Sequence, residues 1–237
     1  MFSTRTIRFL KELEKNNNRE WFTANKQGYE DNVRTPALDY IERMATPLSG
    51  ISPHFVASPR KTGGSLMRVY RDIRFSADKT PYKTNIGIQF RHSAGRDVHA
   101  PGFYLHIEPG DCFLAAGMYK PDSPTLGKVR KMIDEYPDEW ISLRDCLSDN
   151  TGKTNKAKKT GGTNGFSYFG DSLKRPPRGF KDDHPLLDDL KRKHFIVTKK
   201  LPQKIITSRS LVEETTRLFE LASPLVEFVC DACDLAF

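Results

Sequence analysis

Residues 68–85 read RVYRDIRFSADKTPYKTN, and the interpretation of the fold starts from this stretch. From Ser65 to Phe75 apolar and polar side chains alternate, which is the period of a β-strand with one buried face. The apolar side would consist of Met67, Val69, Ile73 and Phe75. The polar side would present Arg68, Tyr70, Asp72 and Arg74. Arg71 falls on the apolar side, so we expect it at the sheet edge or buried against a carboxylate.

Further strand-like segments follow in the sequence. Segments 86–90 and 103–108 alternate in the same way, and 112–119 is apolar with small residues. Segment 195–201 is a candidate fifth strand. Because short polar turns join the first four segments, we predict an α+β fold built on an antiparallel β-meander of about four to five strands.

Helical periodicity flanks the predicted sheet on both sides. Apolar residues recur at helical spacing through the first sixty residues, after Ser123, and from Ser210 to the end. We expect these helices to pack on the sheet in a single domain spanning residues 1–237. Residues 149–165 contain almost no apolar side chain, which predicts a flexible loop.

Composition limits the class of protein. The chain has 237 residues, a formal net charge of +8 and a pI of about 9.3. This charge favours anionic partners, although many intracellular proteins carry similar charge without binding a polyanion. No apolar run approaches the roughly 18 residues of a membrane span, and the first residues lack a signal-peptide pattern. We therefore expect a cytoplasmic protein with no membrane partner.

Four cysteines are present, and Cys230 and Cys233 form a CxxC. A zinc site would need two more ligands, and the sequence has no second CxxC and no HxxxH. A redox CxxC would follow a strand, whereas this one lies in an apolar helical segment. We interpret these two as buried helical cysteines. The sequence indicates no metal site and leaves any cofactor unknown.

The candidate site combines the polar sides of the first and third predicted strands. His106 and Glu108 could exchange protons near neutral pH, and Asp72 would stay ionised between arginines. We predict these three as catalytic residues. Arginine and lysine suit phosphate or carboxylate. The predicted anion-binding residues are Arg68, Arg71, Arg74, Lys79, Tyr82, Lys83, Tyr104, Lys174, Arg175 and Arg178, the last three as a candidate lid.

The resulting hypothesis is a basic pocket for an anionic, phosphorylated small molecule, with hydrolase or transferase chemistry as an option. The alternative, in which these residues have only a structural role, is a flat lattice of salt bridges on the sheet. A nucleic-acid-binding or protein-interaction module using the same basic face is a third interpretation, although no RNP, KH or helix-turn-helix pattern is present. The chain also lacks a G-x-S-x-G elbow, a P-loop and a Rossmann fingerprint.

Five strings spread over nearly the whole chain carry a family resemblance. They are NNREWF from Asn17, RVYRDIRFSADKTPYKT from Arg68, PGFYLHIEPGD from Pro101, AAGMYKP from Ala115 and LKRPPRGFKDDHP from Leu173. In this order they resemble domain-of-unknown-function family 2461, found in bacteria and fungi. The resemblance implies an α+β domain of about this length and brings no established activity, substrate or cofactor. Where the family often has tryptophan, this chain has Tyr119, also aromatic.

Overall fold

A computed structural model describes residues 1–95, 100–148 and 165–237. Within these residues the strands form one antiparallel sheet in the order β1-β2-β3-β4-β6-β5. The α+β prediction is confirmed, and so is the meander, because β2, β3 and β4 are neighbours in chain order. The strands are β1 (Phe55–Val56), β2 (Ile86–His92), β3 (Gly102–Ile107), β4 (Phe113–Met118), β5 (Ser167–Tyr168) and β6 (Phe195–Lys200). The predicted fifth strand is β6, and the predicted loop at 149–165 lies, except for Gly165, outside the described residues.

Helices precede and follow the sheet strands in the chain. Those before β1 are α1 (Thr4–Lys15), α2 (Arg19–Ala24), α3 (Lys26–Tyr29), the π-helical segment η1 (Glu30–Arg34), α4 (Thr35–Arg43) and α5 (Ala45–Ile51). Those after β4 are α6 (Ser123–Glu135), α7 (Pro137–Leu147), α8 (Leu187–Leu190), α9 (Gln203–Ile206) and α10 (Leu211–Asp231).

The chain divides into two compact units. The first comprises residues 1–90, 103–114 and 200–217. The second comprises residues 91–102, 115–199 and 218–237. Each unit has its own buried side chains and is treated separately below.

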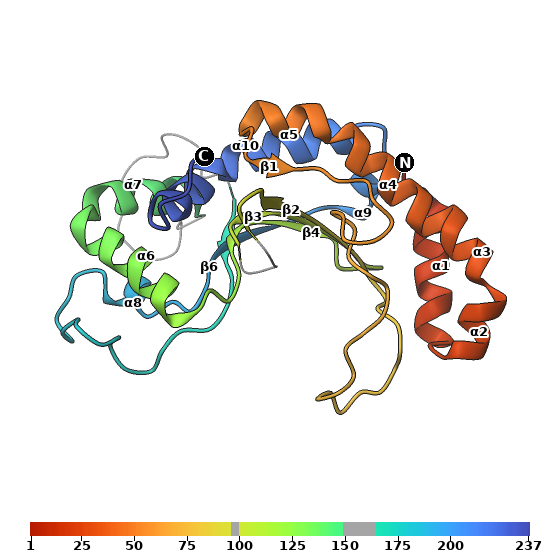
Figure 1. Cartoon of the computed structure of the whole chain (residues 1–237), viewed down its shortest axis with the longest axis horizontal. Coiled ribbons are helices and arrows are strands. Elements are labelled where there is room, and N and C mark those ends of the chain that lie inside the picture. The colour runs from red at the N-terminus through yellow and green to blue at the C-terminus, as the bar shows by residue number, and fades with distance from the viewer. Residues whose placement is uncertain (96–99, 149–164) are drawn as a thin grey trace, which may run out of the picture. The chain divides into compact units, whose positions relative to one another are not determined.

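In the first unit, α4 and α5 lie over one face of β2 and β3 (Figure 1). Tyr40, Met44 and Leu48 from these helices are fully buried, as are Phe90 and Leu105 from the strands. Each such aliphatic or aromatic side chain contributes roughly 1.5–3 kcal/mol through burial. Burial on this side leaves the alternate strand residues on the opposite face, and those residues are the polar ones.

Residues 65–85 form an extended excursion that we call the arm, and Figure 1 shows it leaving the sheet on the side away from α4 and α5. The predicted strand from Ser65 to Phe75 is wrong. Its backbone pairs with the returning leg only through isolated bridges, Leu66 with Ile88 and Tyr70 with Tyr82. Beyond these bridges the arm forms no continuous ladder, and side chains help the chain to turn back at the tip.

Two aspartates supply that help at the tip of the arm. The carboxylate of Asp72 accepts from the Arg74 backbone N–H, and that of Asp78 accepts from the Thr80 backbone N–H. Such local bonds compete with a strand ladder. Phe75, expected on the buried side, is instead 95% exposed at this tip.

Asn17, in the link between α1 and α2, fixes the returning leg of the arm. Its side-chain amide donates to the Tyr82 carbonyl at 2.9 Å, and its amide oxygen accepts from the Tyr82 N–H at 3.0 Å. The Tyr82 ring stacks on Phe22 of α2, with ring centroids 4.0 Å apart. A single asparagine therefore satisfies both backbone groups of a residue that a regular strand would have paired.

The second unit is packed around Trp140 of α7. Its ring contacts Phe195 of β6 and Phe228 of α10, with centroids 5.8 and 5.2 Å away. Near it, the buried carboxylate of Asp189 receives hydrogen bonds from Arg144 at 2.9 Å and Arg192 at 3.0 Å. A buried carboxylate requires such compensation.

We predict that Asn17→Ala loosens the arm. Removing the amide leaves the two polar backbone groups of Tyr82 without their partner, which costs about 1–3 kcal/mol. Urea unfolding should show this loss, and the Tyr82 amide proton should exchange faster with solvent. Asn16→Ala is the control, because Asn16 makes only a local bond to the Glu12 carbonyl. Unchanged stability and unchanged Tyr82 exchange in Asn17→Ala would contradict the role given to Asn17.

Candidate functional site

Three alternate residues of β3 and its end form a row on the face opposite the helices. Tyr104 Oη lies 3.0 Å from His106 Nδ1, and His106 Nε2 lies 3.2 Å from Glu108 Oε2. Thr84, at the end of the arm, donates its hydroxyl to Glu108 Oε1 at 2.8 Å. The strand period of two is what places the three side chains on one face. The structure thus brings together two of the predicted catalytic residues with Tyr104.

The hydrogen bonds define where the protons lie in this row. An ionised Glu108 can only accept, so His106 carries its proton on Nε2 and accepts the Tyr104 hydroxyl at Nδ1. Burial, with the Glu108 charge adding to it, raises the pKa of Tyr104 to about 12. The phenol therefore keeps its proton at neutral pH. The row can pass a proton along its length, with Tyr104 at one end and the half-exposed Glu108 at the other.

Packing holds the row in place. The imidazole of His106 stacks on Phe113 of β4, with centroids 4.5 Å apart and planes 14° from parallel. Gly87 of β2 leaves room for Tyr104, because a Cβ there would lie 2.8 Å from the Tyr104 Oη. Asn85 lies beside His106, with its amide nitrogen 3.4 Å from Nδ1. These contacts confine both rings to one arrangement.

Arg68 and Lys83 lie on the two facing legs of the arm. The Lys83 N–H donates to the Val69 carbonyl at 2.7 Å, which sets the two legs side by side. Burial, and then the charge of Arg68, lowers the pKa of Lys83. Among the described residues neither cation takes part in an ion pair. Within the described part of the chain, these two positive charges, one of them half-buried, therefore form no ion pair, although Asp72 is near enough for the charge of Arg68 to act on it.

The other predicted cations of the arm are occupied. Arg71, which is only partly buried, forms an ion pair with the exposed Asp78. Arg74 binds Asp72 at 2.7 Å and Lys79 donates to the Ile73 carbonyl at 2.9 Å. These residues stabilise the tip of the arm.

The two aspartates of the tip are held ionised. Hydrogen bonding from Arg74 lowers the pKa of Asp72 to about 2. The Thr80 N–H and then Arg71 lower the pKa of Asp78 to about 2. Asp72, predicted as catalytic, therefore serves as the partner of Arg74 and makes no hydrogen bond to the Tyr104–His106–Glu108 row.

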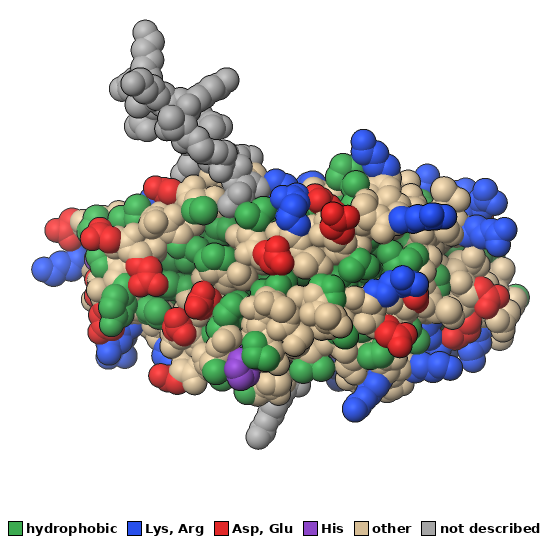
Figure 2. All heavy atoms as spheres, turned by 90° about the horizontal axis from the view of Figure 1, so that it is seen from above, with side chains coloured by type: hydrophobic (Ala, Val, Ile, Leu, Met, Phe, Trp, Pro, Cys, Tyr) green, Lys and Arg blue, Asp and Glu red, His purple; other side chains and the backbone are tan. Residues whose placement is uncertain are grey.

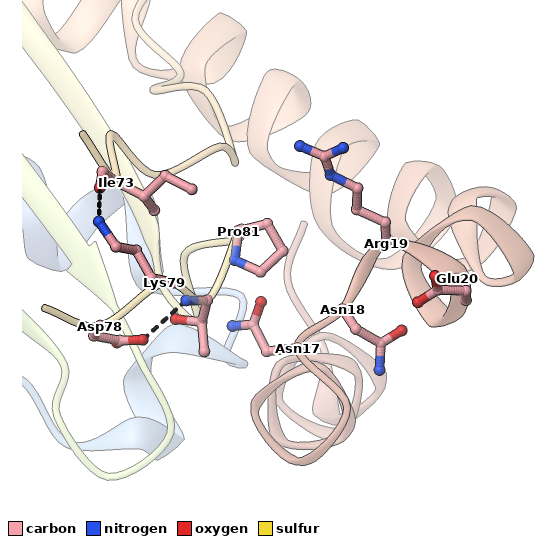
Figure 3. A pocket seen from close by; sticks show the side chains of 9 residues that line it. Asn17, Asn18, Arg19, Glu20, Ile73, Asp78, Lys79 and Pro81 are labelled. Atoms are coloured by element: carbon pink, nitrogen blue, oxygen red, sulfur yellow. Dashed lines mark hydrogen bonds between the residues drawn. The ribbon is translucent and has the colours of Figure 1, made fainter. Parts of the chain in front are cut away.

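A groove of about 560 Å³ lies between the α1–α2 link and the arm tip. It is lined by Asn17, Asn18, Arg19, Glu20, Ile73, Asp78, Lys79, Thr80 and Pro81. Figure 3 shows the Lys79 ammonium bound to the Ile73 carbonyl and the Arg19 guanidinium well apart from it, with Pro81 drawn between the two side chains. Its two cations therefore do not converge on one point.

The remaining predicted residues have different surroundings. Tyr82 is buried, with its ring packed between Phe22 and Tyr70. Lys174, Arg175 and Arg178 belong to the second unit, where all three are exposed. The predicted site is thus divided, and its core in the first unit consists of the Tyr104–His106–Glu108 row and the Arg68–Lys83 pair.

Sequence reasoning missed four contributors to this region, namely Asn17, Thr84, Asn85 and Phe113. Thr84 and Asn85 close the stretch quoted at the outset, and Asn17 begins the NNREWF string. The presence of Asn17 and Thr84 in two of the strings that carry the family resemblance was the available signal, and Asn85 directly follows one of these strings. Phe113 had no signal beyond its place in an apolar strand.

No three His, Cys, Asp or Glu side chains in the described parts of the chain are grouped so that they could hold a metal ion. Cys230 lies buried in α10, and burial raises the pKa of its thiol to about 12. In the same described parts, no helix is both long and apolar enough to cross a bilayer.

Comparison with known proteins identifies the family. The model of the family described as "Conserved hypothetical protein (DUF2461)" matches residues 5–228, nearly the whole chain, so the protein belongs to this family. No curated protein and no solved structure matches the chain.

We predict that Gly87→Ala disrupts the row. The new Cβ would lie 2.8 Å from Tyr104 Oη and 3.0 Å from Met67 Sδ, so the Tyr104 ring must move away from His106. Ultraviolet titration should then show the phenol pKa falling from about 12 toward the ordinary value of 10.

Two further variants complete this experiment. Tyr104→Phe assigns the signal, because burial also raises the pKa of other tyrosines, such as Tyr40 and Tyr168, and only the Tyr104 signal disappears in this variant. Gly50→Ala is the control, since a Cβ on Gly50 meets nothing within 4 Å. A Tyr104 that still titrates near 12 in Gly87→Ala would show that the row does not depend on this close contact.

Proposed function

We propose that this member of the DUF2461 family binds an anionic small molecule, with a phosphate group as the favoured anion, at the base of the arm. The observation that supports this most strongly is the Arg68–Lys83 pair. A half-buried lysine beside an arginine is unfavourable without a counter-charge, and a bound oxyanion supplies that charge. The other arm cations already have carboxylate or carbonyl partners, so they do not compete for the ligand.

The row of side chains on β3 would allow the protein to catalyse a reaction on the bound molecule. Tyr104, His106 and Glu108 can deliver or remove a proton, as a hydrolase or transferase requires. Lys83 is followed directly by Thr84, whose hydroxyl binds Glu108, so the chain itself connects the cation pair to the row. We propose that a ligand anchored by its anion at Arg68 and Lys83 extends toward Tyr104.

The test is thermal unfolding with a panel of nucleotides, sugar phosphates and inorganic phosphate. A ligand at about 100 times its Kd should raise the melting temperature by roughly 5–10 °C. Lys83→Met should strongly diminish this rise, while the variant without ligand is as stable as the natural chain because an unfavourable charge is gone.

Lys11→Met is the matched control, since Lys11 is an exposed lysine of α1 and the substitution removes the same charge. It should keep the full response to the ligand. A panel that leaves the melting temperature unchanged, or an undiminished rise in Lys83→Met, would overturn the proposal.

A second candidate function follows from the arm tip. Phe75 is 95% exposed, and the Arg74 guanidinium lies 5.7 Å from its ring centroid. An exposed aromatic ring beside arginine suits stacking on a nucleic-acid base or contact with a protein. On the face shown in Figure 2, lysines and arginines are interspersed with aspartates and glutamates, so that face offers no patch of one sign for a long polyanion.

For this second candidate we predict that a labelled single-stranded oligonucleotide binds more weakly to Phe75→Ser, by roughly 1–3 kcal/mol. Fluorescence anisotropy at several salt concentrations measures it, and affinity should fall steeply with salt. Tyr136→Ser is the control, because Tyr136 is another exposed aromatic residue, 54% accessible. Absent binding at about 50 mM salt would exclude nucleic acid and leave a protein partner as the remaining use of Phe75.

A further inference from the structure

His194, in the second unit, is held by two chain segments that the proposed function does not use. It precedes β6 and is only 6% exposed. Residues 119–120, which follow β4, lie against one side of its ring, and residues 169–170, which follow β5, lie against another. Residues 119–120 belong to the AAGMYKP string, which carries the family resemblance.

The imidazole of His194 is fixed in position and orientation. Its Nδ1 accepts the backbone N–H of Lys120 at 3.0 Å, and the Tyr119 ring stacks on it with centroids 5.2 Å apart and planes 14° from parallel. At Gly170, where φ is +108°, a Cβ would lie 2.1 Å from His194 Cδ2. Only glycine fits there while the ring keeps this place.

The bond to Lys120 determines the tautomer of His194. A backbone N–H can only donate, so Nδ1 carries no proton and the neutral ring must carry it on Nε2. No described residue accepts from this Nε2–H. The fully buried unpartnered polar atoms of the described residues are Trp140 Nε1 and Tyr168 Oη, so His194 Nε2 reaches the surface. A buried ring thus presents one free donor outward.

The surroundings of this donor are cationic and aromatic. Lys120 has φ of +47°, a strained value for a non-glycine residue, and its ammonium lies 5.3 Å from the Tyr119 ring centroid. Phe169 is 52% exposed, with its ring 6.4 Å from that of His194. Burial, then the charge of Lys120, lowers the pKa of His194; Asp171 opposes this effect and Lys193 adds to it.

The basic loop predicted as a lid, residues 174–178, begins next to the segment that carries His194. The Leu173 N–H donates to the Lys191 carbonyl at 2.8 Å, and the Lys193 N–H donates to the Asp171 carbonyl at 3.0 Å. Residues 174–178, with two arginines and a lysine, continue directly from this pairing. The positive charges of Lys174, Arg175 and Arg178 therefore lie in the same unit as His194.

We propose that His194 anchors a second ligand site, separate from the arm, which takes an oxyanion through His194 Nε2–H and the Lys120 ammonium. Tyr119 and Phe169 form the exposed aromatic walls of this site. Phosphate and carboxylate groups share the required chemistry, since both accept from an imidazole N–H and pair with ammonium. Displacement of surface water from the aromatic walls favours a ligand that carries an apolar or aromatic part beside its anion.

The test is a titration of the full chain with inorganic phosphate and, in a second arm, with acetate, followed by the NMR signals of the histidine side chains. The assignment comes from His194→Gln. We expect the His194 Nε2 signal to shift on ligand addition and its pKa to rise, because a bound anion favours the protonated ring. Comparison of the response to phosphate with the response to acetate shows whether the site takes a phosphate group or a carboxylate group.

The Lys120→Gly variant tests the role of the ammonium without the risk that the substitution unfolds the protein. Glycine accepts a φ of +47° without strain and keeps the N–H that binds Nδ1, so this variant should be at least as stable as the natural chain. Without the ammonium, the apparent Kd for phosphate should rise by up to roughly fivefold. An unchanged Kd would contradict the role of Lys120.

Lys83→Met separates this site from the one proposed at the arm. The response of His194 to phosphate should survive in Lys83→Met with the same apparent Kd as in the natural chain, and any stabilisation by phosphate that remains in this variant belongs to the His194 site. A His194 signal that neither anion moves, or a response that disappears in Lys83→Met, would overturn the proposal.

Discussion

The arm depends on the paired hydrogen bonds between the side chain of Asn17 and the backbone of Tyr82. This contact joins residues 65 positions apart in the chain. At Tyr82 it satisfies the backbone groups that a continuous ladder of strand hydrogen bonds, which the arm lacks, would otherwise have paired. The stacking of Tyr82 on Phe22 adds an apolar contact from the same helical region, so polar and apolar anchors lie together. Without them, the two legs of the arm would have only isolated bridges to hold them parallel.

Holding the legs together has an electrostatic consequence. The arm carries five lysines and arginines against two aspartates, and the tip consumes both carboxylates in pairs with Arg71 and Arg74. Of the three cations that remain, Lys79 donates to the Ile73 carbonyl at the tip, and Arg68 and Lys83 lie nearer the sheet. The ion pairs at the tip correspond to the salt-bridge lattice considered for the sequence, and the base of the arm, with Arg68 and Lys83, is where we propose that an anion binds.

How far the sequence predicted the fold and the site depended on the range of the interactions. Alternation placed Tyr104, His106 and Glu108 on one face correctly, because a strand needs only its own period to do so. The same alternation failed at Ser65–Phe75, where aspartates bind the local backbone and no neighbouring strand completes the ladder. The pairing of Asn17 with Tyr82 could not be inferred, since nothing local to either residue specifies a partner so distant.

The central claim is that the arm, fastened by Asn17, holds the ammonium of Lys83 in a half-buried place beside Arg68 that disfavours its charge. A bound anion then offsets this unfavourable charge. The direct measurement is the pKa of the Lys83 ammonium by NMR, in the natural chain and in Asn17→Ala, with and without phosphate. The account predicts a value below 10.5 in the free chain, a rise with phosphate, and a return toward 10.5 in Asn17→Ala. A pKa near 10.5 in the free natural chain, indifferent to phosphate, would contradict it.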